Sequence, residues 1–218
     1  MRTIRVTGKG LIKVHPDMTR ITITLVGMSP EYSDTLRRST EETEQMKDTL
    51  EPFGIKRTDL KTLSFDIDTE YESYKDKGVY KQRFIGYKFR HILKMEFESD
   101  NKRLGKILYA LANCQLRPEF RIGYTVKDPE ATKNELLGKA VKDAKEKAVV
   151  LSNAAGVELK GIESIDYSWG QINFEYEPMD RAMLAEPCMK MCENSYDIDI
   201  EPDDVDVSDT VTVIWEIA

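Results

Sequence analysis

The feature that most constrains this chain is a long run in which apolar and polar residues alternate. Over residues 85–97 every second position is apolar except His91, and a shorter run over residues 63–71 has the same period, with Thr69 as its one polar member. A period of two is typical of a β-strand with one buried face. The polar, turn-forming stretch from Asp76 to Gly78 lies between the runs. The sequence therefore predicts a long hairpin whose outer end projects beyond the body of the protein, where it would contact a neighbour.

A long amphipathic helix is predicted before this hairpin. It begins at Pro30, with Ser29 as its cap, and ends before Pro52. Its apolar stripe is interrupted by Ser39 and Thr43. These small polar side chains would permit a neighbouring element to approach closely.

Two further helices are predicted after the hairpin. A short helix follows Ser99 or Asp100, and a long helix opens at Asp128 and Pro129 and ends at Gly156. Half of the apolar face of the long helix is alanine, so its axis can lie close to a sheet. Other strands are expected over residues 19–26, 120–126 and 205–217, with two short ones over 162–176. The order of elements predicts an α+β fold: a mostly antiparallel sheet with two long helices and one short helix packed on it, and a long projecting hairpin.

The composition fits one globular unit. The chain has 218 residues, 40% hydrophobic and 33% charged, which is enough to bury a sizeable core. The net charge is -7 and the basic residues are dispersed, which argues against a nucleic-acid-binding surface. We therefore predict a single domain over residues 1–218, with a Met/Cys-rich acidic loop inserted over residues 177–204.

The cellular location is predicted from the apolar segments and the cysteines. No apolar stretch has the length of a signal peptide or of a membrane span. Three cysteines fit a reducing compartment better than a disulfide framework. These observations predict a cytoplasmic protein without a membrane span, or an exported one if a leader was removed.

Four motifs occur in an order and at a spacing that are hard to reach by chance. They are the segment with Ile4, Val6, Thr7, Gly8, Gly10, Val14, Pro16 and Asp17; the entry Phe84, Gly86, Tyr87; the alanine-rich helix with Ala140, Asp143, Ala144, Lys147, Ala148, Leu151, Ala155 and Gly156; and the loop Pro178, Met179, Arg181, Ala182, Met183 with Ile200, Glu201, Pro202 and Val207. Together they resemble the SIMPL-domain family, formerly a domain of unknown function.

The SIMPL-domain family includes a bacterial periplasmic immunogenic protein and relatives linked to oxidative stress. In this resemblance the first motif corresponds to the family's first hairpin. The resemblance also implies a homo-oligomer, because some relatives assemble into large rings. It implies no catalytic residue.

Soft ligands cluster in the predicted loop. Cys188 and Cys192 flank Met189 and Met191, a set of sulfur atoms that suits Cu(I). The spacing differs from that of the usual zinc pair, and no nearby histidine completes a site. Soft-metal binding and thiol redox chemistry stay open as alternatives. We favour a loop that packs on a partner, because methionine adapts to irregular surfaces, and we assign no metal and no cofactor.

The remaining polar groups give no signature of catalysis. The acidic run over residues 197–206 is interpreted as a solvated segment. His15 is expected to be exposed, and His91 to be a hydrogen-bonded buried histidine on the apolar side of its strand. The sequence contains no nucleophile elbow, phosphate loop or HExxH motif. We therefore predict that the protein is not an enzyme.

Aromatic residues gather toward the tip of the predicted hairpin. Such residues can anchor an interface, although paired aromatics on neighbouring strands are a commoner reason for a cluster. We predict an interface formed by Tyr71, Tyr74, Tyr80, Phe84, Tyr87, Met179 and Met183.

Two functional hypotheses follow. The first is a non-catalytic homo-oligomer, or a protein that binds a protein partner, with a role in stress. The second is a module for a small ligand, soft metal or peptide, in which the Met/Cys loop covers a groove beside the alanine-rich helix. A weaker alternative is a thiol-dependent stress enzyme centred on Cys188 and Cys192.

Overall fold

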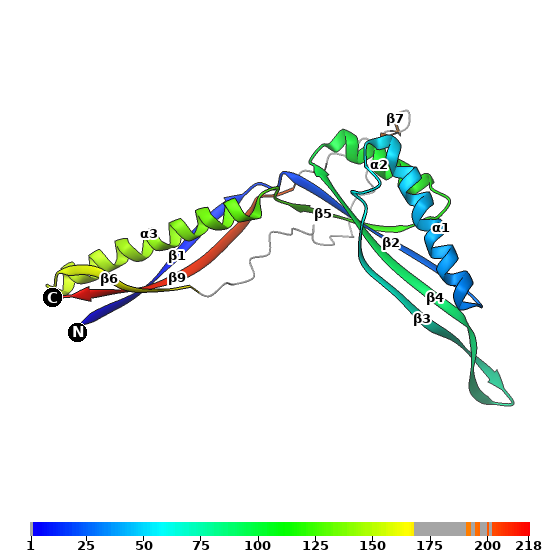
Figure 1. Ribbon diagram of the computed structural model, residues 1–218, viewed down its shortest axis with the longest axis horizontal. Helices are drawn as coiled ribbons and strands as arrows, with labels where there is room; N and C mark the ends of the chain where they lie inside the picture. The colour runs from blue at the N-terminus through cyan, green and yellow to red at the C-terminus, as the bar shows by residue number, and fades with distance from the viewer. Residues whose placement is uncertain (1, 168–190, 193–194, 197–199, 201) are drawn as a thin grey trace. The chain divides into compact units, whose positions relative to one another are not determined.

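A computed structural model describes residues 2–167, 191–192, 195–196, 200 and 202–218. Contacts within the chain divide it into two compact units, which we describe separately (Figure 1). Unit 1 comprises Met1–Asp17, Thr125–Tyr176 and Pro202–Ala218, and unit 2 comprises Met18–Tyr124 and Glu177–Glu201. The predicted α+β fold is confirmed, since helices pack on antiparallel strands in both units. The single domain over residues 1–218 stays a prediction.

The described residues form three α-helices, one 3-10 helix and nine strands. In order they are β1 (Thr3–Val14), β2 (Met18–Ser29), α1 (Tyr32–Leu50), the 3-10 helix η1 (Glu51–Phe53), β3 (Lys61–Asp76), β4 (Val79–Glu98), α2 (Asn101–Asn113), β5 (Glu119–Thr125), α3 (Pro129–Ala155), β6 (Leu159–Asp166), β7 (Met191–Cys192), β8 (Ser195–Tyr196) and β9 (Val205–Ile217).

Unit 1 is a sheet in the order β1-β9-β6 with α3 packed against it (Figure 1). The helix begins and ends as predicted, because the Asp128 carboxylate accepts a hydrogen bond from the Ala131 amide and Gly156 has a left-handed conformation. Strands β1 and β9 pair along their whole lengths, from Thr3 with Glu216 to Val14 with Val205. The core between helix and sheet contains Val6, Ala140, Ala144, Ala148, Val211, Val213 and Trp215.

Helix α3 lies directly on the backbone of β1. A Cβ atom at Gly8 would overlap the backbone of Ala140 and Ala144, and one at Gly10 would overlap the Leu136 carbonyl. The alanine face therefore gives the close approach that the sequence predicts. Strand β1 lies at an edge of its sheet, and on that edge the Lys9 amide donates to the Asp143 carboxylate of α3 at 2.7 Å.

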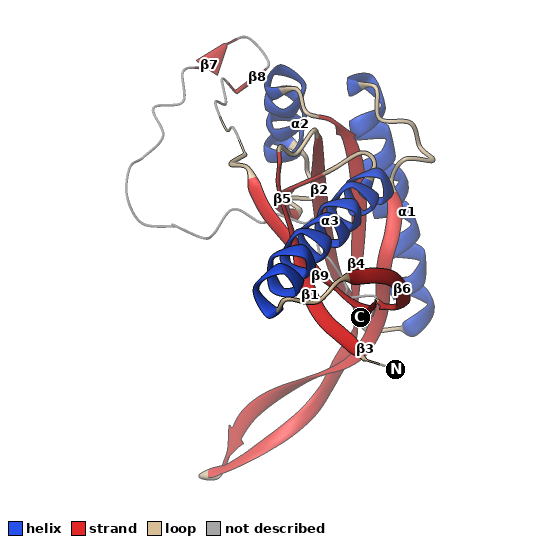
Figure 2. Ribbon diagram, turned by 90° about the vertical axis from the view of Figure 1, so that its left-hand side faces the viewer, coloured by secondary structure: helices blue, strands red, loops and turns tan. Residues whose placement is uncertain are grey.

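Unit 2 is a sheet in the order β3-β4-β2-β5, with α1 and α2 packed on one face (Figure 2). The inward positions of β2 and β4 alternate as the sequence predicts, and they supply the sheet side of the core, while α1, α2 and the connecting segments supply the rest. That core contains Ile21, Ile23, Leu25, Met46, Leu50, Ile55, Leu60, Phe89, Leu93, Met95, Phe97, Leu104, Ile107, Leu108, Leu111 and Cys114.

Two details of the predicted fold are wrong. The first motif is not a hairpin, because β1 pairs with β9 and β2 pairs with β4. The first helix begins at Tyr32 rather than Pro30, and Glu31 precedes it without a side-chain cap. Ser29 is instead the last residue of β2, where it pairs with Tyr87. Strand pairing thus continues through the position that sequence reasoning assigned to the helix cap.

Glycine-to-alanine changes at two positions should have opposite effects on stability. Gly8→Ala should lower the free energy of unfolding by about 2 kcal/mol, because the added methyl must push α3 away from β1. Gly138→Ala is the matched control, because this exposed helical position has open space around it; it should raise that free energy by up to about 1 kcal/mol. Urea unfolding followed by circular dichroism measures both. Equal effects would contradict the close helix–strand contact.

Candidate interaction surface

The outer part of the β3–β4 hairpin is a two-stranded ribbon that extends past the end of α1 (Figures 1 and 2). Strand β4 pairs with β2 only from Tyr87 onward, so residues 79–84 pair with β3 alone. Lys77 and Gly78 turn the ribbon with φ of 48° and 88°, as in the tight turns that match strand twist. The predicted projecting hairpin is therefore confirmed. A two-stranded ribbon is only marginally stable in water, so a partner strand on either open edge would stabilise it.

Gly86 interrupts the regular alternation of β4. The register shifts between Glu70 and Tyr71, and Gly86 has a φ of 148° at the same point. Its missing side chain matters, because a Cβ atom there would overlap the carbonyl oxygen of Ser29. In a regular strand, residues three apart point to opposite faces. The irregularity lets Phe84 and Tyr87 meet, with ring centroids 5.2 Å apart.

Four aromatic rings form one connected cluster, which we call the aromatic cluster: Tyr32, Tyr71, Phe84 and Tyr87. Tyr71 meets Phe84 at 5.8 Å between centroids, and Tyr32 meets Tyr87 at 5.3 Å, in edge-to-face geometry. Tyr71 is 54% exposed and Phe84 is 45% exposed. Large aromatic side chains that are packed together but still accessible are the usual anchors of protein interfaces.

Charged residues occupy the ribbon around these rings. The Arg83 guanidinium donates two hydrogen bonds to Glu72, at 2.9 and 2.7 Å, and the Lys81 ammonium lies 2.6 Å from the Asp76 carboxylate. Toward the tip, Arg83 lies over the Tyr74 ring and Lys75 over the Tyr80 ring. The ribbon thus presents aromatic faces among charges of both signs.

The structure unites only some of the predicted interface residues. Tyr71, Phe84 and Tyr87 join the aromatic cluster, while Tyr74 and Tyr80 make their cation–π contacts nearer the tip. Met179 and Met183 lie outside the described residues. Sequence reasoning missed Tyr32, which it placed in the apolar stripe of α1. Tyr32 meets Tyr87 because the preceding strand pairs with β4, so no local signal in the sequence could have found it.

Two of the four predicted soft ligands lie outside the described residues. Cys188 and Met189 are not described, and the backbone of Met191 and Cys192 forms β7, which pairs with β8. Across the described residues, no three His, Cys, Asp or Glu side chains are grouped so that they could hold a metal ion.

His91 is the buried, hydrogen-bonded histidine that the sequence predicts, at 8% exposure. Its Nδ1 lies 3.1 Å from Thr43 Oγ1 and its Nε2 lies 2.8 Å from Thr62 Oγ1. Thr43 donates its own proton to the Ser39 carbonyl, so Nδ1 donates to Thr43, and in the neutral ring Nε2 then accepts from Thr62. Through these bonds His91 joins β4 to α1 and β3. Burial, and then the positive charge of Lys47, lower the pKa of His91 below its ordinary value.

The neutral state of His91 predicts sensitivity of unit 2 to acid. The folded protein resists protonation of His91, whereas the unfolded chain takes up that proton near the ordinary pKa of about 6.5. Stability should therefore fall as the pH decreases below that value, until the lowered folded-state pKa is passed. Urea unfolding at several pH values measures this slope. His91→Gln should remove most of it, while His15→Gln, at an exposed residue paired with Asp204 in unit 1, should not. A wild-type slope in His91→Gln would refute the assignment.

Comparison with known proteins gives one family and two curated relatives. The family model described as "SIMPL: Protein of unknown function (DUF541)" matches residues 4–215. A 26 kDa periplasmic immunogenic protein of Brucella abortus (strain S19) is 28% identical over 163 residues, which are 74% of this chain and 65% of that protein. The protein of the same description from Brucella melitensis biotype 1 is 27% identical over the same shares. The match thus spans somewhat less than two thirds of the length of these relatives.

These relatives contradict the prediction about the cellular location. The predicted cytoplasmic location is wrong in their light, because both are named as periplasmic proteins. The number of cysteines did not predict the compartment correctly, because a free thiol such as that of buried Cys114 does not define a compartment. Among the helices that the structure describes, none is long and apolar enough to cross a membrane.

Proposed function

Because the chain belongs to the SIMPL family, we propose that it is a non-catalytic protein that assembles with copies of itself through the β3–β4 ribbon. The observation that carries this proposal is the exposed aromatic cluster beside two strand edges that pair with no other strand among the described residues. Strand edges bind other strands through backbone hydrogen bonds, and neighbouring side chains then give specificity.

The charges of the two ribbon strands support a second copy as the partner. The outer part of β3 carries Glu72 and Asp76 against one Lys75, whereas the outer part of β4 carries only the basic residues Lys81 and Arg83. Within one copy these charges form the Arg83–Glu72 and Lys81–Asp76 ion pairs, so the β3 edge of one copy beside the β4 edge of another would extend the same alternation of charge between adjacent strands. Contacts between two different edges repeat around a ring or along a filament. This geometry agrees with the homo-oligomer that the family resemblance implies.

The mass of the particle tests this proposal. Light scattering coupled to size-exclusion chromatography should give a mass above that of one chain. Phe84→Ser should shift the protein toward smaller species, because losing a central aromatic anchor costs about 2 kcal/mol, or roughly a thirtyfold weaker contact. Phe120→Ser is the matched control, since Phe120 is 42% exposed on the opposite edge strand β5 of the same sheet. A monomeric wild type, or equal behaviour of the two variants, would refute assembly through the ribbon.

We also propose that the protein acts in the periplasm. The names of both relatives support this location. Osmotic shock of cells that express the full-length gene should release the protein together with a periplasmic marker enzyme. Release only on lysis, with a cytoplasmic marker, would contradict the proposed location. The ligand-binding and thiol-enzyme alternatives both depend on the Met/Cys-rich loop, most of which lies outside the described residues, and no observation favours them.

A further inference from the structure

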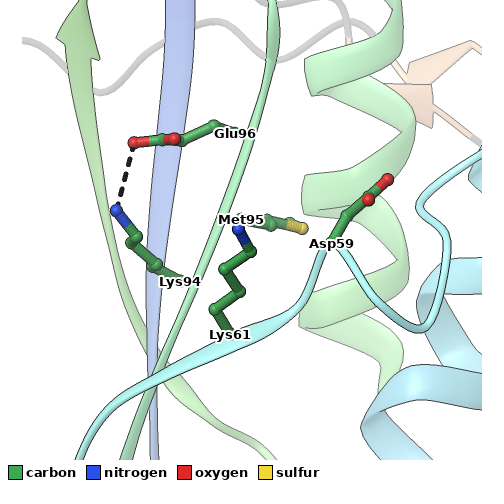
Figure 3. A pocket seen from close by; sticks show the side chains of 5 residues that line it. All are labelled: Asp59, Lys61, Lys94, Met95 and Glu96. Carbon is green, nitrogen blue, oxygen red and sulfur yellow. Dashed lines mark ion pairs between the residues drawn. The ribbon is translucent and has the colours of Figure 1, made fainter.

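The two sides of the unit 2 sheet differ in chemistry. The helices α1 and α2 cover one side, where Phe89, Leu93 and Met95 of β4 are buried in the core. Figure 3 shows Lys94 and Glu96 pointing away from Met95, joined as an ion pair at 3.5 Å. Most positions of β4 on that second side are charged: Lys88, Arg90, Lys94 and Glu96. Successive residues of β4 thus alternate between a helix-covered side and a charged side.

The helix-covered side of the sheet continues along β3 into the ribbon. Phe65 contacts the buried ring of His91, with centroids 5.1 Å apart, and Ile67 packs against the core, so these alternate positions of β3 face the helices. The register shift next to Tyr71 does not interrupt this alternation, because the extra residue, Ile85, lies on β4. The side of the ribbon that carries Tyr71 therefore extends the helix-covered side, although the ribbon itself extends past the end of α1 (Figure 2).

Strand pairing divides the side chains of the ribbon between two sides. The first, which we call the aromatic side, consists of Tyr71, Ser73, Lys75, Tyr80, Gln82 and Phe84. The second, which we call the ion-paired side, consists of Glu72, Tyr74, Asp76, Val79, Lys81 and Arg83. Each ring contact, cation–π contact and ion pair between two of these residues joins members of the same side. The contacts therefore agree with the division that the pairing predicts.

The two sides of the ribbon differ in what they expose. On the ion-paired side each carboxylate already has a basic partner, at 2.6 or 2.7 Å. The aromatic side has no carboxylate, and it exposes Tyr80 at 76%, Tyr71 at 54% and Phe84 at 45%. Among the described residues, no helix packs on β3. The aromatic side thus continues the covered side of the sheet without a cover from its own chain, and exposed apolar patches of this kind mark interaction sites.

We propose that the contact between copies of this chain buries the aromatic side of the ribbon and leaves the ion-paired side in water. This inference rests on the proposed assembly through the ribbon. If Glu72 and Asp76 of one copy lie beside Lys81 and Arg83 of the next, the ion-paired sides of both copies lie on one side of the joined sheet, because alternate residues of a strand share a side. The aromatic sides then lie together on the other.

The energies of burial favour this arrangement. A sheet with one apolar and one charged side is stable when its apolar side is buried. Burying the aromatic side removes the rings from water, whereas burying the ion-paired side would remove four charges from water. A second copy thus supplies the cover that α1 gives to the body of unit 2.

One lysine introduced on each side tests this inference. Gln82→Lys places it on the aromatic side and Val79→Lys on the ion-paired side, on the same strand and with the same change of charge. The aromatic side has no carboxylate to pair with a buried ammonium, so Gln82→Lys should weaken the contact at least about tenfold. Light scattering should then show smaller species. Val79→Lys should keep the wild-type mass, because its ammonium stays in water opposite Asp76.

The controls separate this inference from the assembly itself. A monomeric wild type, or a wild type that Phe84→Ser leaves assembled, would refute the assembly and this inference with it. If Phe84→Ser dissociates the wild-type particle, the assembly stands. The inference alone is then wrong if Gln82→Lys keeps the wild-type mass, or if Val79→Lys dissociates the particle as strongly. Ser73→Lys, at the register partner of Gln82, should act as Gln82→Lys does, and circular dichroism checks that each variant is folded.

Discussion

Unit 2 depends on the pairing of β4 with a different strand on each side. β4 has 20 residues, the longest strand of the described chain, and it supplies the central row of the core. Beyond the last residue that pairs with β2, the same strand continues into the ribbon. The ribbon, the aromatic cluster and the His91 hydrogen bonds each use residues of this one strand. Their spacing is therefore fixed by the rise of a single extended backbone, and a change of register would disturb all three at once.

Elements with a strong local signal could be predicted from the sequence, and their partners could not. The alternation through Phe89 and Leu93 and the flanking signals Asp128 and Gly156 each depend on residues close together in the chain. The pairing of β1 with β9 joins residues about two hundred positions apart, and the local pattern of apolar residues carries no information about such a pairing. The start of α1 was misplaced for a related reason: Ser29 has the chemistry of a helix cap, but pairing with Tyr87 keeps it in a strand.

In the candidate sites, too, residues with a local sequence pattern could be predicted, and their partners in space could not. The sequence indicated an aromatic group near the hairpin tip, but not that Gly86 would bring Phe84 and Tyr87 to one face or that α1 would add Tyr32. His91 was predicted correctly, because its place on the apolar side of a strand is itself a local pattern.

The pairing of β1 with β9 also sets an order of folding during synthesis. Residues 18–124, which hold the core of unit 2, have all left the ribosome well before residues 205–217 are made. Domains commonly fold as they emerge, so unit 2 can close first. Strand β1 can pair only after β9 has been made, because the opposite edge of β1 is covered by α3, whose Asp143 carboxylate accepts from the Lys9 amide. A nascent chain that stalls before β9 is made would therefore expose β1 as an unpaired, glycine-containing strand while unit 2 is already folded. A chaperone that holds unfolded segments would need to protect this intermediate.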